Sequence, residues 1–237
     1  MPFFYSENVN AAKRSRTRAS SKQRRNNKMG FIKWFLGEEP GLLDKLAHCD
    51  DKGHYGEYLA KYALGNNNLN GYSKILCNIY IPYRGKTSEI DILLIHEKGL
   101  YVFESKNYSG WIFGSAESKK WTQCLNSKTK YQFYNPIMQN NTHINAISYF
   151  LKMPKDAFRS YILFSDRCEF KKIPPNCDQY IIIHRKNLLK EIRSELKTKG
   201  NFYTKEKIDE IYNTLLPLTQ ISIEDKQKHI EHVKQYK

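Results

Sequence analysis

The chain has 237 residues, of which 40% are hydrophobic, and it carries a formal net charge of +15 at pH 7. These values predict one folded domain with appendages, or two small domains, and the excess of positive charge predicts a polyanionic partner, nucleic acid ahead of an anionic membrane surface. No apolar run reaches the roughly 18 residues that a membrane span requires, and the charges near the N-terminus follow its apolar residues, which argues against a signal peptide.

Residues 1–28 are predicted to form a disordered basic arm, because like charges at this density repel and the serine and asparagine residues among them bury nothing. We interpret the arm as a contact to phosphate, with a solvated tail of no function as the alternative. A true start at Met29 is a further alternative. The candidate nucleic-acid-binding residues of the arm are Lys13, Arg14, Arg16, Arg18, Arg24 and Arg25.

Residues 29–43 are predicted to be a linker that contains an apolar patch, Phe31–Leu36. Packing of this patch on the domain is the preferred interpretation, and contact with a membrane surface, together with the arm, is the alternative. A helical pattern follows over Asp44–Leu64, with a break near Gly53.

Three apolar runs in the middle of the chain predict strands. A turn over Pro82–Ser88 separates the first run from the second, and a tight turn over Glu97–Gly99 joins the second to the third. A further short strand is expected between Gly110 and Gly114. The three apolar runs are Ile75–Ile81, Ile90–Ile95 and Leu100–Lys106.

The second half of the sequence predicts both strands and helices. A helix is expected over Asn135–Leu151, with Pro136 near its start, where proline is tolerated. Residues 221–237 are expected to form a charged tail or helix. The order of the elements predicts a central mixed β-sheet flanked by helices, an α/β or α+β fold. The remaining elements are the strands Phe158–Phe164 and Tyr180–His184 and the helices Lys186–Lys199 and Thr204–Leu215.

Charged residues interrupt two of the most apolar strands: Asp91 in the first, and Glu104 and Lys106 at the end of the next. Because side chains alternate along a strand, Glu104 and Lys106 point to the same side. Buried charges are costly unless they pair, bind a metal or face a cleft. An ion-pair network that only holds the sheet is the alternative, but two acids and one base leave a negative site that a metal would complete.

Carboxylates from neighbouring strands can converge on one hard cation, and oxygen ligands suit Mg²⁺ or Mn²⁺. Such a cation bridges a phosphate oxygen and a water, stabilises the charge that develops on phosphorus and lowers the pKa of the water. Lys106 would orient or deprotonate this water, or stabilise the oxyanion. Glu57, on the preceding helix, would supply a further ligand directly or through water, with a solvated helix position as its alternative. The reaction class is metal-assisted hydrolysis of a phosphodiester.

Five pieces of the sequence occur in order between Tyr55 and Phe164: GEYLAKYAL, SEIDILLI, GLYVFESKNYSGWIFG, the tryptophan of KKW, and NPIMQNNTHI. Together they resemble the nuclease-related domain (NERD) family of the PD-(D/E)xK nuclease superfamily. Ile90 stands before Asp91 where the superfamily's name places a proline, and members of the family commonly lack this proline too.

The resemblance implies a restriction-endonuclease-like fold, with a core over residues 44–165 that residues 166–220 complete. It implies that Asp91 and Glu104 bind the metal and that Lys106 serves the attacking water. Glu57 is similar to the acidic residue of the first core helix. Gln139 is similar to a glutamine that lies near the site on a later helix, with a surface position as its alternative.

Four further residues have a functional and a structural interpretation. For His143, which shares a helix face with Gln139, a buried structural histidine is preferred over a contact to phosphate or metal. For Trp111 and Trp121, a core position is preferred over stacking on bases. Ser105 lies on the opposite strand face from Glu104 and Lys106, which argues against a nucleophilic serine.

The preferred hypothesis is a divalent-metal-dependent nuclease that acts on DNA. The alternatives are a catalytically inactive nucleic-acid-binding module of the same fold and a protein of the membrane surface. Cleavage of both strands of a duplex would require two active sites and therefore a homodimer. The five scattered cysteines form no CxxC pair, so reduced thiols and a cytoplasmic location are expected.

Overall fold

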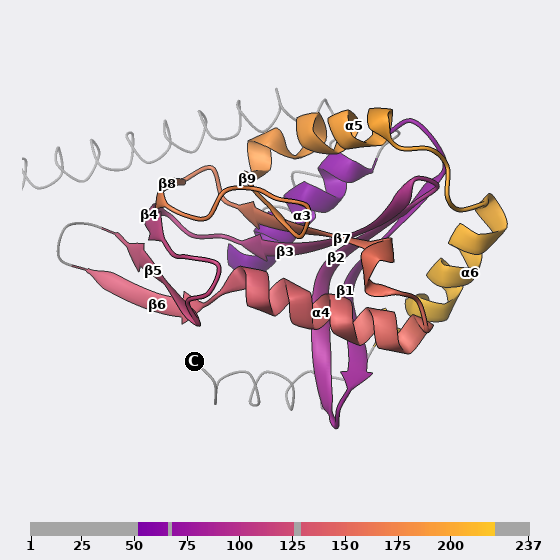
Figure 1. Cartoon of the computed structure of the whole chain (residues 1–237), viewed down its shortest axis with the longest axis horizontal. Coiled ribbons are helices and arrows are strands. Elements are labelled where there is room, and N and C mark those ends of the chain that lie inside the picture. Colours follow the sequence, from indigo (N-terminus) through magenta and orange to yellow (C-terminus); the bar gives the residue numbers. More distant parts are fainter. Residues whose placement is uncertain (1–51, 66–67, 126–128, 221–237) are drawn as a thin grey trace, which may run out of the picture. The chain divides into compact units, whose positions relative to one another are not determined.

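The computed structural model describes residues 52–65, 68–125 and 129–220 (Figure 1). The chain divides into two units, residues 1–50 and 51–237, and every described residue belongs to the second. The predicted basic arm with its six candidate residues, the apolar patch, the start of the first helix and the charged C-terminal segment lie outside the described residues. Within the described residues, no helix combines the length and the apolar character needed to cross a membrane.

A five-stranded sheet forms the centre of the described unit, in the strand order β1-β2-β3-β7-β9 (Figure 1). The first three strands form an antiparallel meander, and β7 and β9 run parallel to β3. The sheet is therefore mixed, and the predicted fold class is confirmed. The strands are β1 (Ser73–Tyr83), β2 (Lys86–His96), β3 (Gly99–Lys106), β7 (Phe158–Phe164) and β9 (Ile181–His184).

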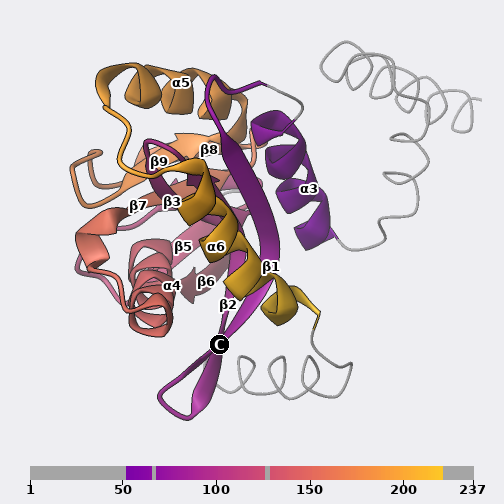
Figure 2. The ribbon, with the colours of Figure 1, turned by 90° about the vertical axis from the view of Figure 1, so that its right-hand side faces the viewer.

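Helices cover both faces of this sheet (Figure 2). One core cluster joins α3 (Lys52–Leu64) and α5 (Leu188–Thr198) to one face of the strands, and a second joins α4 (Pro136–Leu151) and α6 (Lys205–Leu215) to the other. Short 3-10 turns occupy Lys155–Ala157, Arg185–Asn187 and Leu216–Thr219. Burial on both faces explains why the central strands read as nearly continuous apolar runs.

The start of α4 follows from its local sequence. The Asn135 side chain accepts a hydrogen bond from the backbone N–H of Ile137 at 2.9 Å and so caps the helix. Pro136 occupies the first turn, where a missing N–H costs nothing. The Asn135 amide also donates to three backbone carbonyls of the segment 115–118, which ties the start of α4 to the loop before β5 (Lys120–Cys124).

The turn predicted over Pro82–Ser88 is wrong in its extent. Strand β1 continues to Tyr83 and β2 begins at Lys86, so that only Arg84 and Gly85 remain between them. Both residues have positive φ, 51° and 73°, as a two-residue hairpin turn requires. Pro82 is tolerated inside β1 because this strand lies at the edge of the sheet.

A second sheet of four short strands, in the order β6-β5-β4-β8, packs beside the first (Figure 1). Only β4 (Gly110–Phe113) was expected, because β5, β6 (Lys130–Tyr134) and β8 (Cys168–Lys172) carry many polar residues and no long apolar run. Trp121 of β5 is fully buried, as predicted, and its ring stacks on that of Phe164.

The core position expected for Trp111 is wrong. This side chain is 44% exposed, because it alternates with the buried Ile112 and so points to the other face of β4.

Candidate active site

Asp91 lies where β2 is irregular. The ladder between β1 and β2 pairs Cys77 with Ile92 and Ile79 with Ile90, and it omits Asn78 and Asp91 between them. Asn78 has a φ of 52°, a left-handed conformation that asparagine tolerates better than most residues.

This irregularity changes the face to which β2 residues point. Ile92 belongs to the core cluster beneath α3, whereas Ile90, two residues earlier, belongs to the cluster beneath α4. Regular alternation would place both on one face. The Asp91 carboxylate turns towards β3 at this point, and its Oδ2 accepts a hydrogen bond from the backbone N–H of Ser105 at 2.7 Å.

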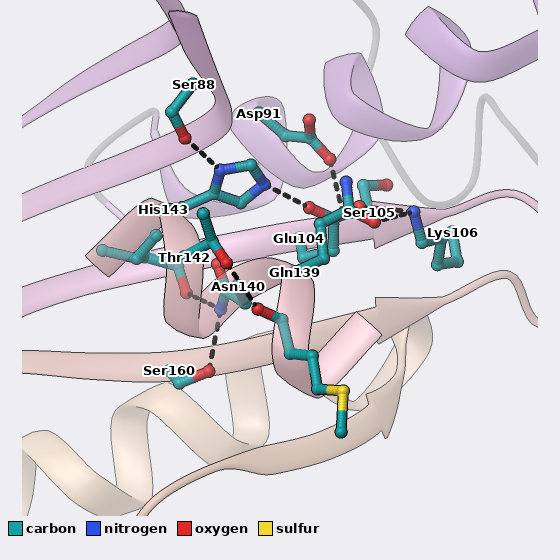
Figure 3. A network of polar contacts seen from close by, with 12 residues as sticks. Ser88, Asp91, Glu104, Ser105, Lys106, Gln139, Asn140, Thr142, His143 and Ser160 are labelled. Atoms are coloured by element: carbon teal, nitrogen blue, oxygen red, sulfur yellow. Dashed lines mark hydrogen bonds and ion pairs between the residues drawn. The ribbon is translucent and has the colours of Figure 1, made fainter. Parts of the chain in front are cut away.

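Glu104, Lys106 and Gln139 form a connected group at the end of β3 (Figure 3). Glu104 and Lys106 do point to the same side, and Lys106 Nζ lies 2.5 Å from Glu104 Oε1. Lys106 also donates a hydrogen bond to Oε1 of Gln139, on α4, at 3.0 Å. The structure therefore brings the predicted glutamine to the predicted lysine, across 33 positions of sequence.

His143 connects the same group to β2. Its Nε2 donates to Oε2 of Glu104 at 3.0 Å, because a carboxylate can only accept, and its Nδ1 lies 2.7 Å from the hydroxyl of Ser88 (Figure 3). The side chain is buried, as predicted, but it contacts a candidate metal ligand as well as the framework. Both oxygens of Glu104 are thus held in place, one by Lys106 and one by His143.

Asn140, next to Gln139 on α4, fastens the helix to the sheet. Its amide donates to the carbonyl of Val102 at 3.0 Å and to the hydroxyl of Ser160 at 2.8 Å, and so bridges β3 and β7. Because α4 also carries Gln139 and His143, this contact sets the depth at which both side chains meet β3. Sequence analysis missed Asn140, Ser88 and Asn78, and the only signal for them is a polar residue within an apolar pattern.

Glu57 reaches the site from α3. The helix packs on β3 closely at Gly56, where an added Cβ would lie 3.2 Å from the Ser105 hydroxyl and 2.5 Å from Nη2 of the buried Arg185. The glycine therefore permits the close approach of the helix. The neighbouring Glu57 raises the pKa of Asp91 by charge repulsion, so its carboxylate lies within electrostatic range of the site.

The charges at this site do not balance. Burial, the Glu104 carboxylate and the Glu57 carboxylate together raise the pKa of Asp91 well above its ordinary value. Burial alone would raise the pKa of Glu104, but Lys106 and His143 outweigh it and lower that pKa. Burial alone would lower the pKa of Lys106, but Glu104 and other neighbours raise it. These directions favour the charged forms of Glu104 and Lys106 and disfavour the charged form of Asp91, which a cation would stabilise.

The donor set suits a magnesium ion rather than zinc. Among the described residues, no group of three or more His, Cys, Asp and Glu side chains is arranged to hold a metal ion, so Glu57 does not complete a three-ligand set with Asp91 and Glu104. Mg²⁺ is commonly bound by one or two carboxylates, with waters and substrate phosphate filling its other positions. Oδ1 of Asp91 accepts no hydrogen bond from the described part of the chain, which leaves it available beside Glu104. The residues present therefore fit such an ion.

Comparison with known proteins identifies the family of the chain. Residues 52–165 match the family model of the nuclease-related domain. An uncharacterised protein of Bacillus anthracis is 32% identical over 184 residues, which cover 77% of this chain and 84% of the relative. No solved structure matches the chain. With the matched region spanning Glu57, Asp91, Glu104, Lys106 and Gln139, the chain belongs to the nuclease-related domain family.

Proposed function

We propose that this protein is a divalent-metal-dependent nuclease that hydrolyses phosphodiester bonds of DNA. One observation carries the proposal: Asp91, Glu104 and Lys106 meet between the interior strands β2 and β3 of a buried sheet, with Lys106 paired to Glu104 and bonded to Gln139. A network that served only stability would be a poor choice, since buried ion pairs are often no better than apolar side chains of the same size. The free energy that is lost by burying these charges is explained if the group takes part in catalysis.

Asp91 and Glu104 would hold Mg²⁺ or Mn²⁺, and Glu57 would assist through a water. When bound, the ion supplies a Lewis acid for the phosphate oxygen and lowers the pKa of the attacking water. The raised pKa of Asp91 supports this assignment, because its carboxylate lacks enough positive charge nearby.

Lys106 would act as a charged donor that orients the water or stabilises the developing oxyanion. Its ammonium has three N–H donors, of which Glu104 and Gln139 use two. The third is available for a water or a phosphate oxygen. Because its neighbours raise its pKa, the lysine remains protonated, which favours this role over that of a general base.

Gln139 and His143 would act as positioning residues. Gln139 limits the rotation of the Lys106 ammonium, and His143 fixes the second oxygen of Glu104. Hydrogen-bonded partners of this kind orient metal ligands and are commonly worth about 10–100-fold in affinity or activity.

The test is cleavage of labelled linear, supercoiled and single-stranded DNA in Mg²⁺, Mn²⁺ or EDTA. Wild type is compared with Asp91→Ala and Lys106→Ala, and with Lys190→Ala, an exposed lysine on α5, as the matched control. Metal-dependent cleavage that both site variants lose and the control keeps supports the proposal. No cleavage under any condition, with DNA still bound, would replace it with the inactive binding module. Comparing nicked and linearised plasmid also tests the predicted homodimer, since cutting both strands together calls for two sites.

A further inference from the structure

The four-stranded sheet has one face towards the core and one towards solvent. Ile112, Trp121 and Phe133 share the inner face, where they pack with Phe164 of β7. By alternation and by the observed register, the neighbouring residues share the opposite side, which we call the outward face. The outward face carries Trp111, Phe113, Lys120, Thr122, Cys124, Lys130, Gln132, Tyr134, Glu169 and Lys172.

Aromatic rings on the outward face are open to solvent. Trp111 is 44% exposed and Tyr134 is 39% exposed, and Phe113 is partly exposed beside them. Trp111 and Phe113 lie two positions apart on one strand, a spacing of roughly 7 Å. Exposed aromatic rings on a β-sheet form the platform on which nucleic-acid-binding domains stack unpaired bases.

Positive charge surrounds these rings. Lys120, Lys130 and Lys172 lie on the outward face, and the Nζ of Lys171 sits 5.0 Å from the centre of the Trp111 ring. Glu169 is the single acidic residue in these four strands. Its carboxylate forms an ion pair with the Nζ of Lys171, at 2.6 Å. The surface therefore offers aromatic faces for bases and ammonium groups for phosphates, and an acidic or apolar protein partner would use only one of the two.

Two short chain segments join the four-stranded sheet to the candidate active site, one before β4 and one after β6. Strand β4 begins four residues after Lys106, which limits the distance between Lys106 and Gly110 to about 14 Å. Strand β6 ends at Tyr134, five residues before Gln139 on α4. In the connection, Tyr108 packs on Phe133 with ring centres 4.5 Å apart. A chain held on this sheet would therefore lie one short segment away from the catalytic group.

We propose that the outward face binds a single-stranded segment of nucleic acid, with Trp111 and Tyr134 each stacking on an unpaired base at a different point of the segment and the surrounding lysines contacting phosphates. The inference rests on the proposed nuclease function for its biological meaning, and it adds the form of substrate that the enzyme would hold. A duplex would not satisfy it, because paired bases present no free face to the rings.

The experiment measures binding by the full chain in EDTA, where no cleavage occurs. Fluorescence anisotropy follows labelled oligo(dT), oligo(rU) and a duplex of the same length. Trp111→Ala and Tyr134→Ala are each expected to weaken single-strand binding about tenfold, and duplex binding much less. The loss should persist at raised salt, because stacking releases no counterions. Stronger binding of the two oligonucleotides than of the duplex supports the surface.

Two controls separate stacking from folding. Phe202→Ala removes an aromatic ring that is 71% exposed elsewhere, and it should leave binding unchanged. Trp111→Phe should keep most of the affinity while losing the quenching of tryptophan emission that the oligonucleotide causes, since Trp121 is fully buried. Trp34→Phe is introduced into both proteins so that the third tryptophan of the chain does not contribute to the emission. Equal losses for single strand and duplex, unchanged binding in both alanine variants, or a dimer that Trp111→Ala dissociates would each overturn the proposal.

The binding proposal and the nuclease proposal can fail independently, and the experiments distinguish the two failures. Wild type that never cleaves, but binds oligo(dT) through Trp111, would remove the nuclease and retain the surface. Wild type that cleaves in Mg²⁺, with single-strand affinity and KM unchanged in both alanine variants, would remove the surface and retain the nuclease.

Discussion

The two sheets of this protein use polar residues in opposite ways. The five-stranded sheet is covered by helices on both faces, and three of its charged residues, Asp91, Glu104 and Lys106, are gathered between β2 and β3. Among the described residues, the four-stranded sheet is covered on one face, and lysines and aromatic rings occupy its other face. A buried sheet can hold a few charges in fixed geometry, whereas a half-covered sheet can present a broad surface. We therefore assign chemistry to the first and substrate binding to the second.

The largest expected effect is a difference in the free energy of unfolding between variants on the two faces of the four-stranded sheet. Trp121→Ala removes a fully buried ring that stacks on Phe164 and donates from its indole N–H to the carbonyl of Ser115 at 2.9 Å. We expect the free energy of unfolding to fall by about 3–5 kcal/mol. Trp111→Ala should cost about 1 kcal/mol or less, because the exposed ring makes mainly a contact with Lys171. Urea denaturation measures both, and equal costs would contradict the assignment of the two faces.

The next effect separates chemistry from binding. Lys106→Ala should lower kcat for DNA cleavage about 10²–10³-fold, because it removes a charged donor from the developing negative charge. Its affinity for DNA in EDTA should stay close to that of wild type. Trp111→Ala should instead raise KM and leave kcat largely intact, since binding on a surface is equal in the ground and transition states. Single-turnover kinetics with both variants checks this prediction. A fall of kcat in Trp111→Ala with KM unchanged would contradict the assignment of binding, rather than chemistry, to Trp111.

A smaller effect is expected from removing His143, which holds the candidate metal ligand Glu104 in place. His143→Ala should lower metal affinity or activity about 10–100-fold, because Glu104 loses the donor that holds its second oxygen. His143→Gln should recover part of the loss, since an amide N–H can also donate. Thr142→Ala alters the exposed neighbour on the same helix and serves as the control. Titration calorimetry with Mn²⁺ gives the affinity directly, and unchanged binding in His143→Ala would limit this residue to packing.

The smallest effect concerns a part of the five-stranded sheet that is remote from the chemistry. Burial lowers the pKa of His96, at the end of β2, even though the ring contacts the carbonyl of Asn70. The folded state therefore favours the neutral imidazole, and its contribution to stability is complete above the ordinary histidine pKa of about 6.5. It is lost as the pH falls from that value towards the lower pKa of the folded state. Urea midpoints measured across this range should fall more in wild type than in His96→Gln.

The sequence alone determined the features that depend on local order. Period-two alternation placed Glu104 and Lys106 on the same side of β3, and the structure confirms it with a 2.5 Å contact. Long apolar runs located the central strands because these are buried on both faces. A proline after a capping asparagine located the start of α4 to within a residue.

Only the tertiary structure decided which side chains meet. Gln139 bonds to Lys106, and His143 to Glu104, because Asn140 seats α4 at a particular depth on β3 and β7, a contact between residues far apart in sequence. The shift of face at Asp91 depends on the left-handed Asn78 of the neighbouring strand.

Three of the four strands of the second sheet, β5, β6 and β8, were beyond the reach of the sequence for the same physical reason. Its strands are short and half exposed, so their apolar patterns are weak and pairing with neighbours decides their structure. Alternation is a property of the chain and can be read from it. Strand pairing and helix seating depend on the packing of distant segments, which minimises the free energy of the whole domain and has no local signature.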